Sequence, residues 1–552
     1  MIDRRKFLAI GAGVTAAAAR ASPAAAELDT AYINARVWTG AGPAVRTDAI
    51  GVTGDRIAAI GSAAVRAASG KRTRIVDLEG AFVTPGFIDP HTHFVKASIM
   101  LSQASLRDAA SPEEFVQRVA AAARALPKGQ WLEGGNWDQD RWGGKMPDRH
   151  WIDAVTPDTP VAVIRYDLHM LLLNSLALKL AGIDRNTPEV PGGVIERDAK
   201  GEPTGIIKDA ATALVLRAIG DPTPAQIDAA VRKGIELALS KGVTQVHTTE
   251  LDWISFDSTR RLRVAGEPGI RFRHYLPLKD WERQADLIRR EGAGDDWVQW
   301  GGCKVVFDGS LGSRTALFYD PYLDEPGTRG IIVTDPADLR RWIEGADRAG
   351  LQVTAHAIGD RANDIVLDIM AAVAKANGKR DRRFRVEHVQ HMKPAAIPRF
   401  AQQDVIASVQ PYHAIDDGRW AVRRIGEERL KTSFAFGSLV RSGAHVCLGS
   451  DWPVAPLDPL TGLEAAVVRE TIDGKNPDGW FPEQRVTLAQ ALRGYTGEGA
   501  YAGFAEKKLG LVAPGFLADL AVFDRDLFAI DSHLLHQAKV VRTIVGGVQR
   551  FG

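Results

Sequence analysis

Between about residue 85 and residue 503 the chain alternates short apolar runs with longer amphipathic segments. The apolar runs predict eight strands, at residues 81–94, 241–250, 270–278, 298–310, 351–360, 384–391, 404–413 and 444–454. Segments rich in Ala, Leu and Arg, such as residues 225–242 and 336–350, predict helices between some of them. Eight strands that alternate with helices indicate an α/β fold, a (β/α)₈ barrel of the TIM type.

This span is longer than the ~250 residues that such a barrel needs. Most of the excess lies between the first two predicted strands, at about residues 96–225. We therefore expect a lobe inserted after strand 1 of the barrel.

The two ends of the chain share a different pattern. Residues 30–84 and 508–551 consist of short strand-like runs broken by Gly and Asp-Arg turns, as in hairpins. Each end is too small to bury a core alone. We expect residues 27–84 and 504–552 to pair into one small composite β-sandwich domain, with the barrel at residues 85–503 inserted between them.

The first 26 residues predict an export signal. They contain the pair Arg4-Arg5, a weakly apolar Ala/Gly run and a small-residue cleavage site that ends near Ala26. This pattern is typical of bacterial signals read by the twin-arginine export machinery, and it predicts a periplasmic or otherwise exported protein. The alternative is an amphipathic N-terminal helix. The run is too short and too rich in Ala for a stable membrane span, and no other segment predicts one.

Composition narrows the class of protein. The chain has 552 residues, 45% of them hydrophobic and 25% charged, which is usual for a soluble globular protein. A net charge of +1 argues against a nucleic-acid binder, which would show a strong basic excess. With two cysteines, Cys303 and Cys447, a disulfide scaffold and a Cys-rich metal site are both excluded.

Residues that can bind metal stand at the ends of most predicted strands. In barrel order they are His91 and His93, His247, Lys304, His356, His388, His413 and Asp451. Catalytic groups of these barrels lie at the C-terminal ends of the strands, so we expect these side chains to converge. In a strand, residues two apart point to one face, so His91 and His93 can bind one ion of the Zn²⁺ type. Taken alone, the same pair could be ordinary surface histidines.

Lys304 alternates with Val306 and Asp308 and is expected to point into the barrel. Burial shifts the pKa of a lysine toward the neutral amine. A neutral amine can add CO₂ and form a carbamate, whose two oxygens bridge two divalent ions. The alternative is a lysine that pairs with Asp308 or another carboxylate of the barrel.

Asp451 is the expected proton-handling group. A carboxylate beside a metal-activated water can take its proton and pass it to a leaving group. The alternative is an aspartate that caps the segment after the last strand.

Four motifs resemble those of a known family. They are GFIDPHTHF at residues 86–94, HAIGD around His356, RVEHVQH around His388 and GSDWPV around Asp451. These segments look like the amidohydrolase superfamily, and most like its amidohydrolase-3 branch, which includes N-substituted formamide deformylase. Further segments of the same kind are GGNWDQDRW, NSLALKLAGI, PGGVIERDAKGEPTGIIKDA and KVVFDGSLGSRTA, so the resemblance spans almost the whole chain after the signal.

The resemblance implies roles for named residues. His91 and His93 would bind one metal ion, His356 and His388 a second, Lys304 would bridge them as a carbamate, and Asp451 would complete the site. Substrate-binding positions would be Trp137, Asp138, His169, His247, Arg314 and His413. After His169 this chain carries the apolar stretch Met170–Leu173, where similar proteins have smaller or more polar residues, which suggests an apolar pocket wall. His391 is expected to face away from His388 and to be a bystander.

These features predict an exported metal-dependent amidohydrolase that cleaves an amide-type C–N bond of a small molecule. Lactone or carbamate hydrolysis and metal-assisted isomerisation in the same site are alternatives, as is a non-catalytic metal-containing binding protein. The expected cofactor is one or two divalent ions of Zn²⁺ type, and Fe²⁺, Mn²⁺ or Co²⁺ would suit the same ligands. Relatives suggest a homodimer, although the sequence shows no interface pattern.

Overall fold

The computed structural model describes residues 27–44, 46–101, 104–127, 129–220 and 222–552. The predicted export signal, residues 1–26, lies outside the described residues.

The centre of the molecule is an eight-stranded parallel sheet whose strands follow one another in chain order. They are β8 (Phe87–Thr92), β15 (Val243–Thr248), β16 (Arg271–Pro277), β17 (Val298–Val306), β18 (Gln352–Ala357), β19 (Arg385–His388), β20 (Ile406–Val409) and β21 (Val446–Leu448). Each strand lies within one of the eight ranges predicted from the apolar runs. The prediction of a TIM-type (β/α)₈ barrel is therefore confirmed.

The barrel closes where β21 meets β8. The backbone N–H of Asp451 donates to the carbonyl of His91 at 2.7 Å, and Thr92 and Trp452 form a parallel bridge. Gly449 permits this approach, because a Cβ at that position would lie 2.8 Å from Oδ1 of Asp89 and 3.0 Å from the backbone nitrogen of His91. The seam therefore places Asp451 directly beside the His91 segment.

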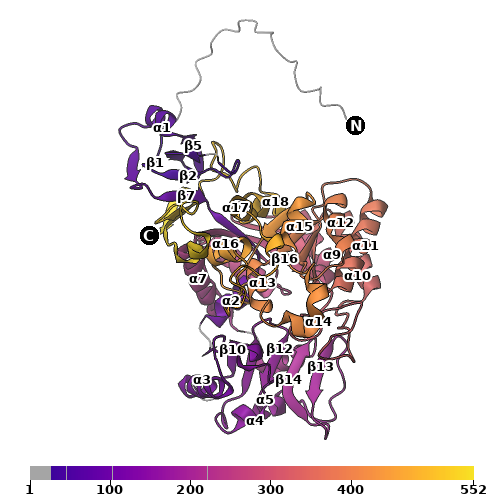
Figure 1. The fold of residues 1–552 in the computed structure, drawn as a ribbon. Helices are drawn as coiled ribbons and strands as arrows, with labels where there is room; N and C mark the ends of the chain where they lie inside the picture. The colour runs from indigo at the N-terminus through magenta and orange to yellow at the C-terminus, as the bar shows by residue number, and fades with distance from the viewer. Residues whose placement is uncertain (1–26, 45, 102–103, 128, 221) are drawn as a thin grey trace.

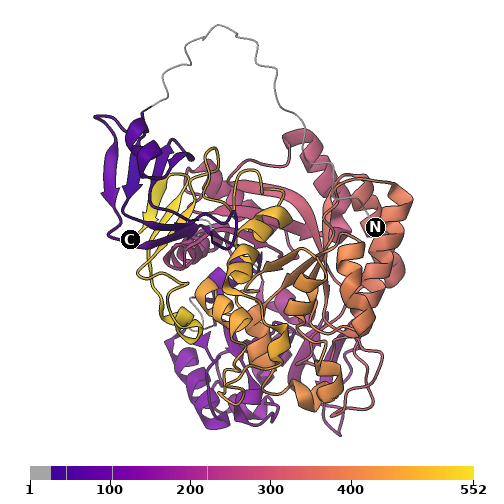
Figure 2. The same cartoon turned by 45° about the horizontal axis from the view of Figure 1, so that its top comes forward.

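Helices cover the outside of the barrel and bury its apolar outer face (Figures 1 and 2). They include α7 (Pro224–Ser240), α8 (Ile254–Val264), α9 (Trp281–Glu291), α10 (Pro336–Arg348), α11 (Asp360–Asn377), α12 (Ile397–Gln402), α15 (Phe436–Arg441), α16 (Pro459–Val467), α17 (Leu488–Gly494) and α18 (Gly497–Ala502). The helix α7 begins at a capping box in which Thr223 and Gln226 satisfy each other's backbone N–H groups. Two further helices, α13 (Pro411–Asp417) and α14 (Ala421–Leu430), lie between β20 and α15 in the chain.

The chain between β8 and β15 forms a separate lobe. After α2 (Phe94–Met100) it builds a six-stranded sheet with the order β13-β14-β12-β11-β10-β9. The strands are β9 (Ala104–Ser105), β10 (Leu132–Trp137), β11 (Val161–Arg165), β12 (Met170–Leu173), β13 (Gly193–Arg197) and β14 (Pro203–Asp209). The helices are α3 (Pro112–Ala125), α4 (His150–Asp153), α5 (Ser175–Leu180) and α6 (Thr212–Ile219). In Figure 1 this lobe lies below the barrel, next to α14.

The two ends of the chain meet in two further sheets. A four-stranded sheet contains β1 (Thr30–Ile33), β4 (Ile50–Thr53), β5 (Arg56–Ile60) and β6 (Arg74–Asp77), with α1 (Ser62–Ala68) after β5. A six-stranded sheet contains β2 (Arg36–Trp38), β3 (Arg46–Thr47), β7 (Phe82–Pro85), β22 (Leu520–Phe523), β23 (Val540–Val545) and β24 (Val548–Phe551). Strands β7 and β22 pair antiparallel, and side chains of both sheets share one apolar core.

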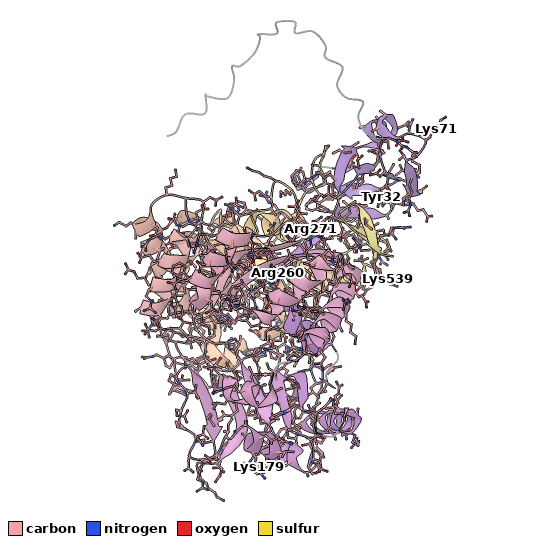
Figure 3. All side chains as sticks on the ribbon, turned by 180° about the vertical axis from the view of Figure 1, so that it is seen from behind. Tyr32, Lys71, Lys179, Arg260, Arg271 and Lys539 are labelled. Atoms are coloured by element: carbon pink, nitrogen blue, oxygen red, sulfur yellow. The ribbon has the colours of Figure 1, made fainter. Side chains whose placement is uncertain are left out.

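An ion pair joins these end sheets to the barrel. Arg271, the first residue of β16, donates from Nε to Asp519 at 2.7 Å, just before β22. Seen from behind, Arg271 lies between the barrel helix that carries Arg260 and the end sheets around Tyr32 (Figure 3). Within the described part of the chain, no helix has the length and apolar character needed to cross a membrane.

Candidate metal centre

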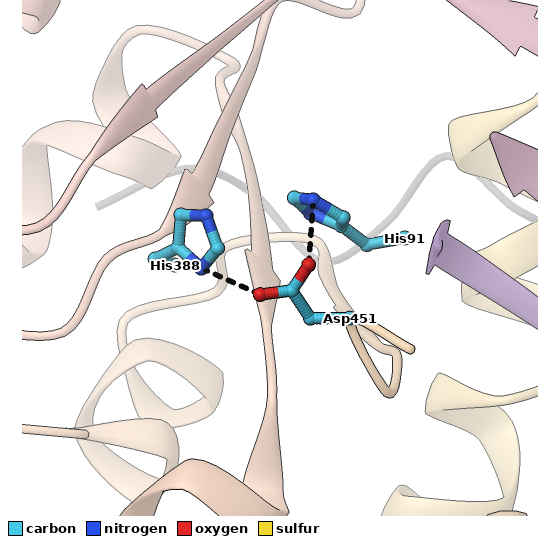
Figure 4. A group of neighbouring side chains, drawn as sticks. All are labelled: His91, His388 and Asp451. Atoms are coloured by element: carbon cyan, nitrogen blue, oxygen red, sulfur yellow. Dashed lines mark ion pairs between the residues drawn. The ribbon is translucent and has the colours of Figure 1, made fainter. Parts of the chain in front are cut away.

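Three residues far apart in the sequence converge at the C-terminal mouth of the barrel. His91 comes from β8, His388 ends β19, and Asp451 follows β21, and one ligand atom of each lies within 4.8 Å of the others. The Asp451 carboxylate lies between the two imidazoles, with Oδ1 at 3.4 Å from His91 Nε2 and Oδ2 at 3.9 Å from His388 Nδ1 (Figure 4). All three side chains are buried. The predicted convergence of these three positions is therefore present.

The remaining predicted ligands lie around this group. His93 Nε2 is 3.2 Å from Oδ1 of Asp451, and Lys304 Nζ is 3.4 Å from His91 Nε2. The ring of His356 is 4.4 Å from the ring of His388, measured between centroids. The six predicted metal-site residues thus form one cluster.

Hydrogen bonds fix the orientation of three imidazoles. Nδ1 of His91 faces Glu387 Oε2 at 2.5 Å, and Nδ1 of His388 faces Gln410 Oε1 at 3.0 Å. Nε2 of His356 faces the carbonyl oxygen of Gly309 at 3.2 Å. Because each of these ring nitrogens meets an acceptor, it carries the proton, and the other nitrogen keeps a lone pair. Metal-binding histidines are oriented in this way in proteins.

Burial keeps the histidines neutral. It lowers the pKa of His91 to about 4 and holds the pKa values of His93, His356 and His388 well below the usual range. Neutral imidazoles and a carboxylate are the donors that Zn²⁺ and similar divalent ions prefer. The residues present therefore fit a divalent metal.

Lys304 is buried among these groups, and burial lowers its pKa to about 8, although the charges of Glu387 and Asp451 act in the opposite direction. Among the described residues no carboxylate forms an ion pair with it. Asp308 instead accepts the backbone N–H groups of Ile358 and Gly359, at 3.0 and 2.9 Å. The alternative in which Lys304 pairs with Asp308 is thus not what the structure contains.

A cavity of about 970 Å³ opens from the cluster. Its lining includes His93, Lys304, His356, His388 and Asp451. It runs between the mouth of the barrel and the inserted lobe, with walls from both. A volume of this size is at the upper end of ordinary small-molecule sites.

Two of the predicted substrate-binding residues, His169 and His413, line this cavity. Nδ1 of His169 donates to Asp209 Oδ1 at 2.6 Å. Burial disfavours the imidazolium, but the hydrogen bond and charge of Asp209 outweigh this and raise the pKa of His169. Leu171, from the apolar stretch after His169, also lines the cavity.

The other four predicted substrate-binding residues do not line the cavity. Trp137 is buried in the lobe core and donates from Nε1 to the carbonyl of Val163 at 2.9 Å. Asp138, directly after β10 of the lobe, is buried and accepts from Arg419 at 3.1 Å.

Arg314 forms ion pairs with Asp324 and Glu325, at 3.0 and 3.3 Å. His247 lies deeper in the barrel, where Arg385 donates to its Nδ1 at 3.2 Å. These four residues thus lie away from the cavity wall, and their role in substrate binding stays a prediction. His391 faces the hydroxyl of Ser433 at 2.7 Å and does not line the cavity; its expected bystander role stays a prediction.

The sequence reading missed Glu387, which orients His91. Alternation along a strand would place Glu387 and His388 on opposite faces. The structure brings both to the interior, because His388 and Val389 adopt φ angles of 74° and 47° and end the regular strand. Glu387 could have been found because it is a carboxylate in an apolar strand, directly before a predicted metal ligand. A carboxylate that is buried in such a strand needs partners.

A sequence profile of the amidohydrolase family matches residues 74–551. The chain is 39% identical over 551 residues to the protein LONG AFTER FAR-RED 3 of Arabidopsis thaliana, across 96% of this chain and 92% of the relative. It is 33% identical over 486 residues to the putative amidohydrolase YtcJ of Bacillus subtilis, across 86% and 90%. It is 30% identical over 549 residues to N-substituted formamide deformylase of Arthrobacter pascens, across 95% and 98%.

Solved structures agree with these relatives. The crystal structure of an uncharacterized metal-dependent hydrolase from Pyrococcus horikoshii superposes with a TM-score of 0.73 at 29% sequence identity, covering 91% of this chain and 99% of that one. A second such hydrolase, from Pyrococcus furiosus, gives a TM-score of 0.71 over 90% of this chain and 99% of its own. The chain belongs to the amidohydrolase family and is a hydrolase that acts on carbon–nitrogen bonds.

Proposed function

We propose that this protein uses a divalent metal to hydrolyse an amide-type C–N bond of a small molecule. The observation that carries the proposal is the cluster of neutral, buried imidazoles and one carboxylate at the head of a 970 Å³ cavity. His91, His93, Lys304, His356, His388 and Asp451 would hold a divalent ion there, and the chemistry it would supply is an acidified water and a polarised substrate carbonyl. We expect Zn²⁺ to be that ion.

Asp451 is the proposed proton carrier. Its carboxylate touches the imidazoles of both His91 and His93 and borders the cavity. As water attacks the carbonyl carbon, a C–O bond forms and Asp451 accepts the proton that the water loses. When the C–N bond breaks, Asp451 delivers this proton to the departing nitrogen.

His413 is proposed to stabilise the negative charge that develops on the carbonyl oxygen. Gln390 Nε2 donates to its Nδ1 at 3.2 Å, so the proton of the neutral ring is on Nε2. Nε2 lies 3.8 Å from Asp451 Oδ2, and none of the described residues offers it a hydrogen bond. A buried donor of this kind on the cavity wall can be placed against a developing oxyanion.

We propose that Lys304 would act as a metal ligand in the form of a carbamate, which would supply negative charge to a site with more than one divalent ion. The support is its burial and the lowered pKa of its amine, which leaves a reactive fraction of neutral amine at neutral pH. CO₂ adds to this amine nitrogen and one proton leaves, giving a carboxylate-like group in place of a cation.

The test combines elemental analysis with a hydrolysis screen of amides, lactones and carbamates. We expect two ions per wild-type chain, one or none in Lys304→Ala, and unchanged content in Lys179→Ala, an exposed lysine on the lobe. Asp451→Asn should retain most metal and lose turnover by a factor of about 10² or more. A wild-type protein that binds no divalent metal, or Asp451→Asn with full activity, would contradict the proposal.

We also propose that the chain is exported by the twin-arginine route, on the basis of Arg4-Arg5 and the run that follows. Fractionation of bacteria that produce the full chain should place it in the periplasm. Replacing both arginines by lysine should leave it in the cytoplasm, and equal distribution of the two forms would contradict export by this route.

A further inference from the structure

The cavity has an apolar arm that leads away from the metal centre. The arm is defined by Ile99, Met100, Trp131, Leu171, Leu216, Ile219, Ile227 and Ile254, all of which line the cavity. Helix α2 begins directly after His93, and Ile99 and Met100 lie at its far end. At 1.5 Å per helical residue, the residues of α2 that line the cavity reach about 10 Å along the helix axis from His93.

The arm leaves apolar side chains uncovered. Leu216 of α6 and Ile254 of α8 keep 55% and 39% of their surface exposed although both line the cavity. Exposed apolar surface that continues into a cavity with reactive groups is typical of a ligand site. A small amide alone would leave this part of the cavity unused.

Glu250 stands where the arm meets the metal centre. It follows β15, lines the cavity and is only 5% exposed. Its Oε1 accepts the backbone N–H groups of Val95 and Lys96, at 2.5 and 3.0 Å, and so caps the first turn of α2. The carboxylate thereby holds the segment that carries His93.

The second oxygen of Glu250 is buried without a partner. None of the described residues reaches hydrogen-bonding geometry with Oε2. Burial, together with the charge of Asp252, raises the pKa of Glu250 to about 7. The side chain of Ser255 acts against this shift but does not bond Oε2. Lys96 acts on Glu250 only through its charge, without an ion pair. A buried carboxylate oxygen with no donor is costly, and a ligand that supplies an N–H or O–H removes that cost.

We propose that the substrate is an amide whose larger half is a long apolar group with a hydrogen-bond donor near the scissile bond. The apolar group occupies the arm, and the donor bonds Oε2 of Glu250. Glu250 is thus a residue that determines specificity. This inference rests on the proposed amide hydrolysis, since it names the class of substrate for the same site.

Binding can be measured without any turnover. The probes are primary alkylammonium ions of six to twelve carbons, compared with trimethylammonium ions of the same chain lengths, which keep the charge but lack an N–H donor. Calorimetry on the intact, metal-loaded wild-type protein should show a gain in affinity of about threefold to fourfold per buried methylene group. The primary ions should bind about tenfold more tightly than their trimethyl counterparts.

Two variants locate the ligand. Glu250→Gln keeps an oxygen for the N–H groups of α2 but places an amide where the free oxygen was, so it should abolish the preference for the primary ions. Asp257→Asn is the matched control, because Asp257 is an exposed carboxylate on α8 that does not line the cavity, and it should keep the preference. Leu216→Asp, at an exposed position of the arm, should remove most of the dependence on chain length.

Two results would overturn the inference: affinity that does not rise with chain length in the wild type, or a preference for primary ions that survives in Glu250→Gln. If Glu250→Gln loses the fold, as seen by circular dichroism, the chain-length series and the comparison of primary with trimethyl ions in the wild type still decide. Equal affinity of the wild type for the two kinds of ion would also overturn the inference. Ligand binding with no hydrolysis of any amide would refute the proposed function alone. Amide hydrolysis with no binding in the arm would refute the specificity alone.

Discussion

Glu387 lies outside the proposed set of metal ligands, and yet its carboxylate orients one of them, His91. Its carboxylate is fully buried and accepts from His91, from the hydroxyl of Thr354 and from Arg385. Burial opposes its ionisation, but Arg385 and His91 outweigh this and hold the pKa of Glu387 well below the usual range. The ionised carboxylate fixes the proton of His91 on Nδ1 and leaves Nε2 free toward Asp451.

Replacing Glu387 by Gln should weaken metal binding. The amide can no longer accept from both Arg385 and His91, so the orientation and tautomer of His91 become less fixed. We expect the affinity for Zn²⁺ to fall about 10- to 100-fold, measured by competition with a chelator. The control is Glu498→Gln, because Glu498 forms a similar pair with His445 at 2.8 Å on the periphery. Equal metal affinity in both variants would show that Glu387 does not act through His91.

The state of Lys304 should depend on pH and on CO₂. Because burial lowers the pKa of its amine to about 8, the neutral form rises from about a tenth at pH 7 to about nine tenths at pH 9. Only the neutral amine adds CO₂. Metal uptake by metal-free protein should therefore increase with pH over this range, and only when bicarbonate is present.

This uptake can be followed with ¹³C-labelled bicarbonate, which should give a carbamate signal that is absent in Lys304→Ala. Metal uptake that is the same with and without bicarbonate would contradict a bridging carbamate.

At the residue scale, the candidate metal ligands could be predicted from the sequence better than the residues that orient them. His91, His356, His388 and Asp451 were visible because each ends a predicted strand, and the strand ends of a barrel share one mouth. The roles of Glu387 and Glu250 could not be predicted from the sequence. The role of Glu387 depends on a break in strand alternation, and that of Glu250 on the start of a neighbouring helix. Trp137 was assigned to the pocket by resemblance, but its ring fills the lobe core.

Among the elements, the seam between β21 and β8 is the most sensitive to sequence. Gly449 lies there, against Oδ1 of Asp89 and the backbone of His91. The N–H of Ser450 also donates to Asp89 Oδ1, at 3.0 Å. One tight contact thus sets the distance between the strands that carry His91 and Asp451.

Gly449→Ala should disturb both strands at once. Its Cβ would have to displace the Asp89 carboxylate or the β8 backbone, at a cost of about 1–3 kcal/mol of unfolding free energy. We expect a lower melting temperature together with weaker metal binding. Gly327→Ala is the control, since a Cβ there meets nothing within 4 Å. A variant with a lower melting temperature but normal metal binding would show that the seam contributes to stability and not to the metal site.

The barrel strands were predictable as elements because both of their faces are buried, which makes each a continuous apolar run. The strands of the lobe were not predicted one by one. Of these, β13 is half-buried, and β10 contains Gly134 and Gly135, both with positive φ, so neither gives a clean apolar run. The sequence therefore indicated an insertion but not its sheet.

In the whole molecule, ion pairs hold the lobe against the barrel. Arg419, just before α14, contacts Asp138 of the lobe at 3.1 Å, and Arg423 within α14 contacts Asp140 at 3.0 Å. Neither contact follows from sequence spacing, because the paired residues are 281 and 283 positions apart. These pairs fix the lobe at the barrel mouth, so the cavity has a wall on each side.

Metal removal should destabilise the whole molecule, because the ligands come from strands distributed around the barrel. An ion that binds only the folded chain stabilises it by about 4 kcal/mol when its concentration is a thousand times the dissociation constant. Chelation should therefore lower the melting temperature by several degrees, and added Zn²⁺ should restore it. His91→Ala should melt at one temperature with or without chelator, whereas His445→Ala, at a peripheral histidine, should respond as the wild type does. If chelation leaves the melting temperature of the wild-type protein unchanged, the cluster does not connect these strands through a metal. Residues on β8, on β19 and beyond β21 that shared a bound ion would gain stability from it, and removal of the ion would lower the melting temperature.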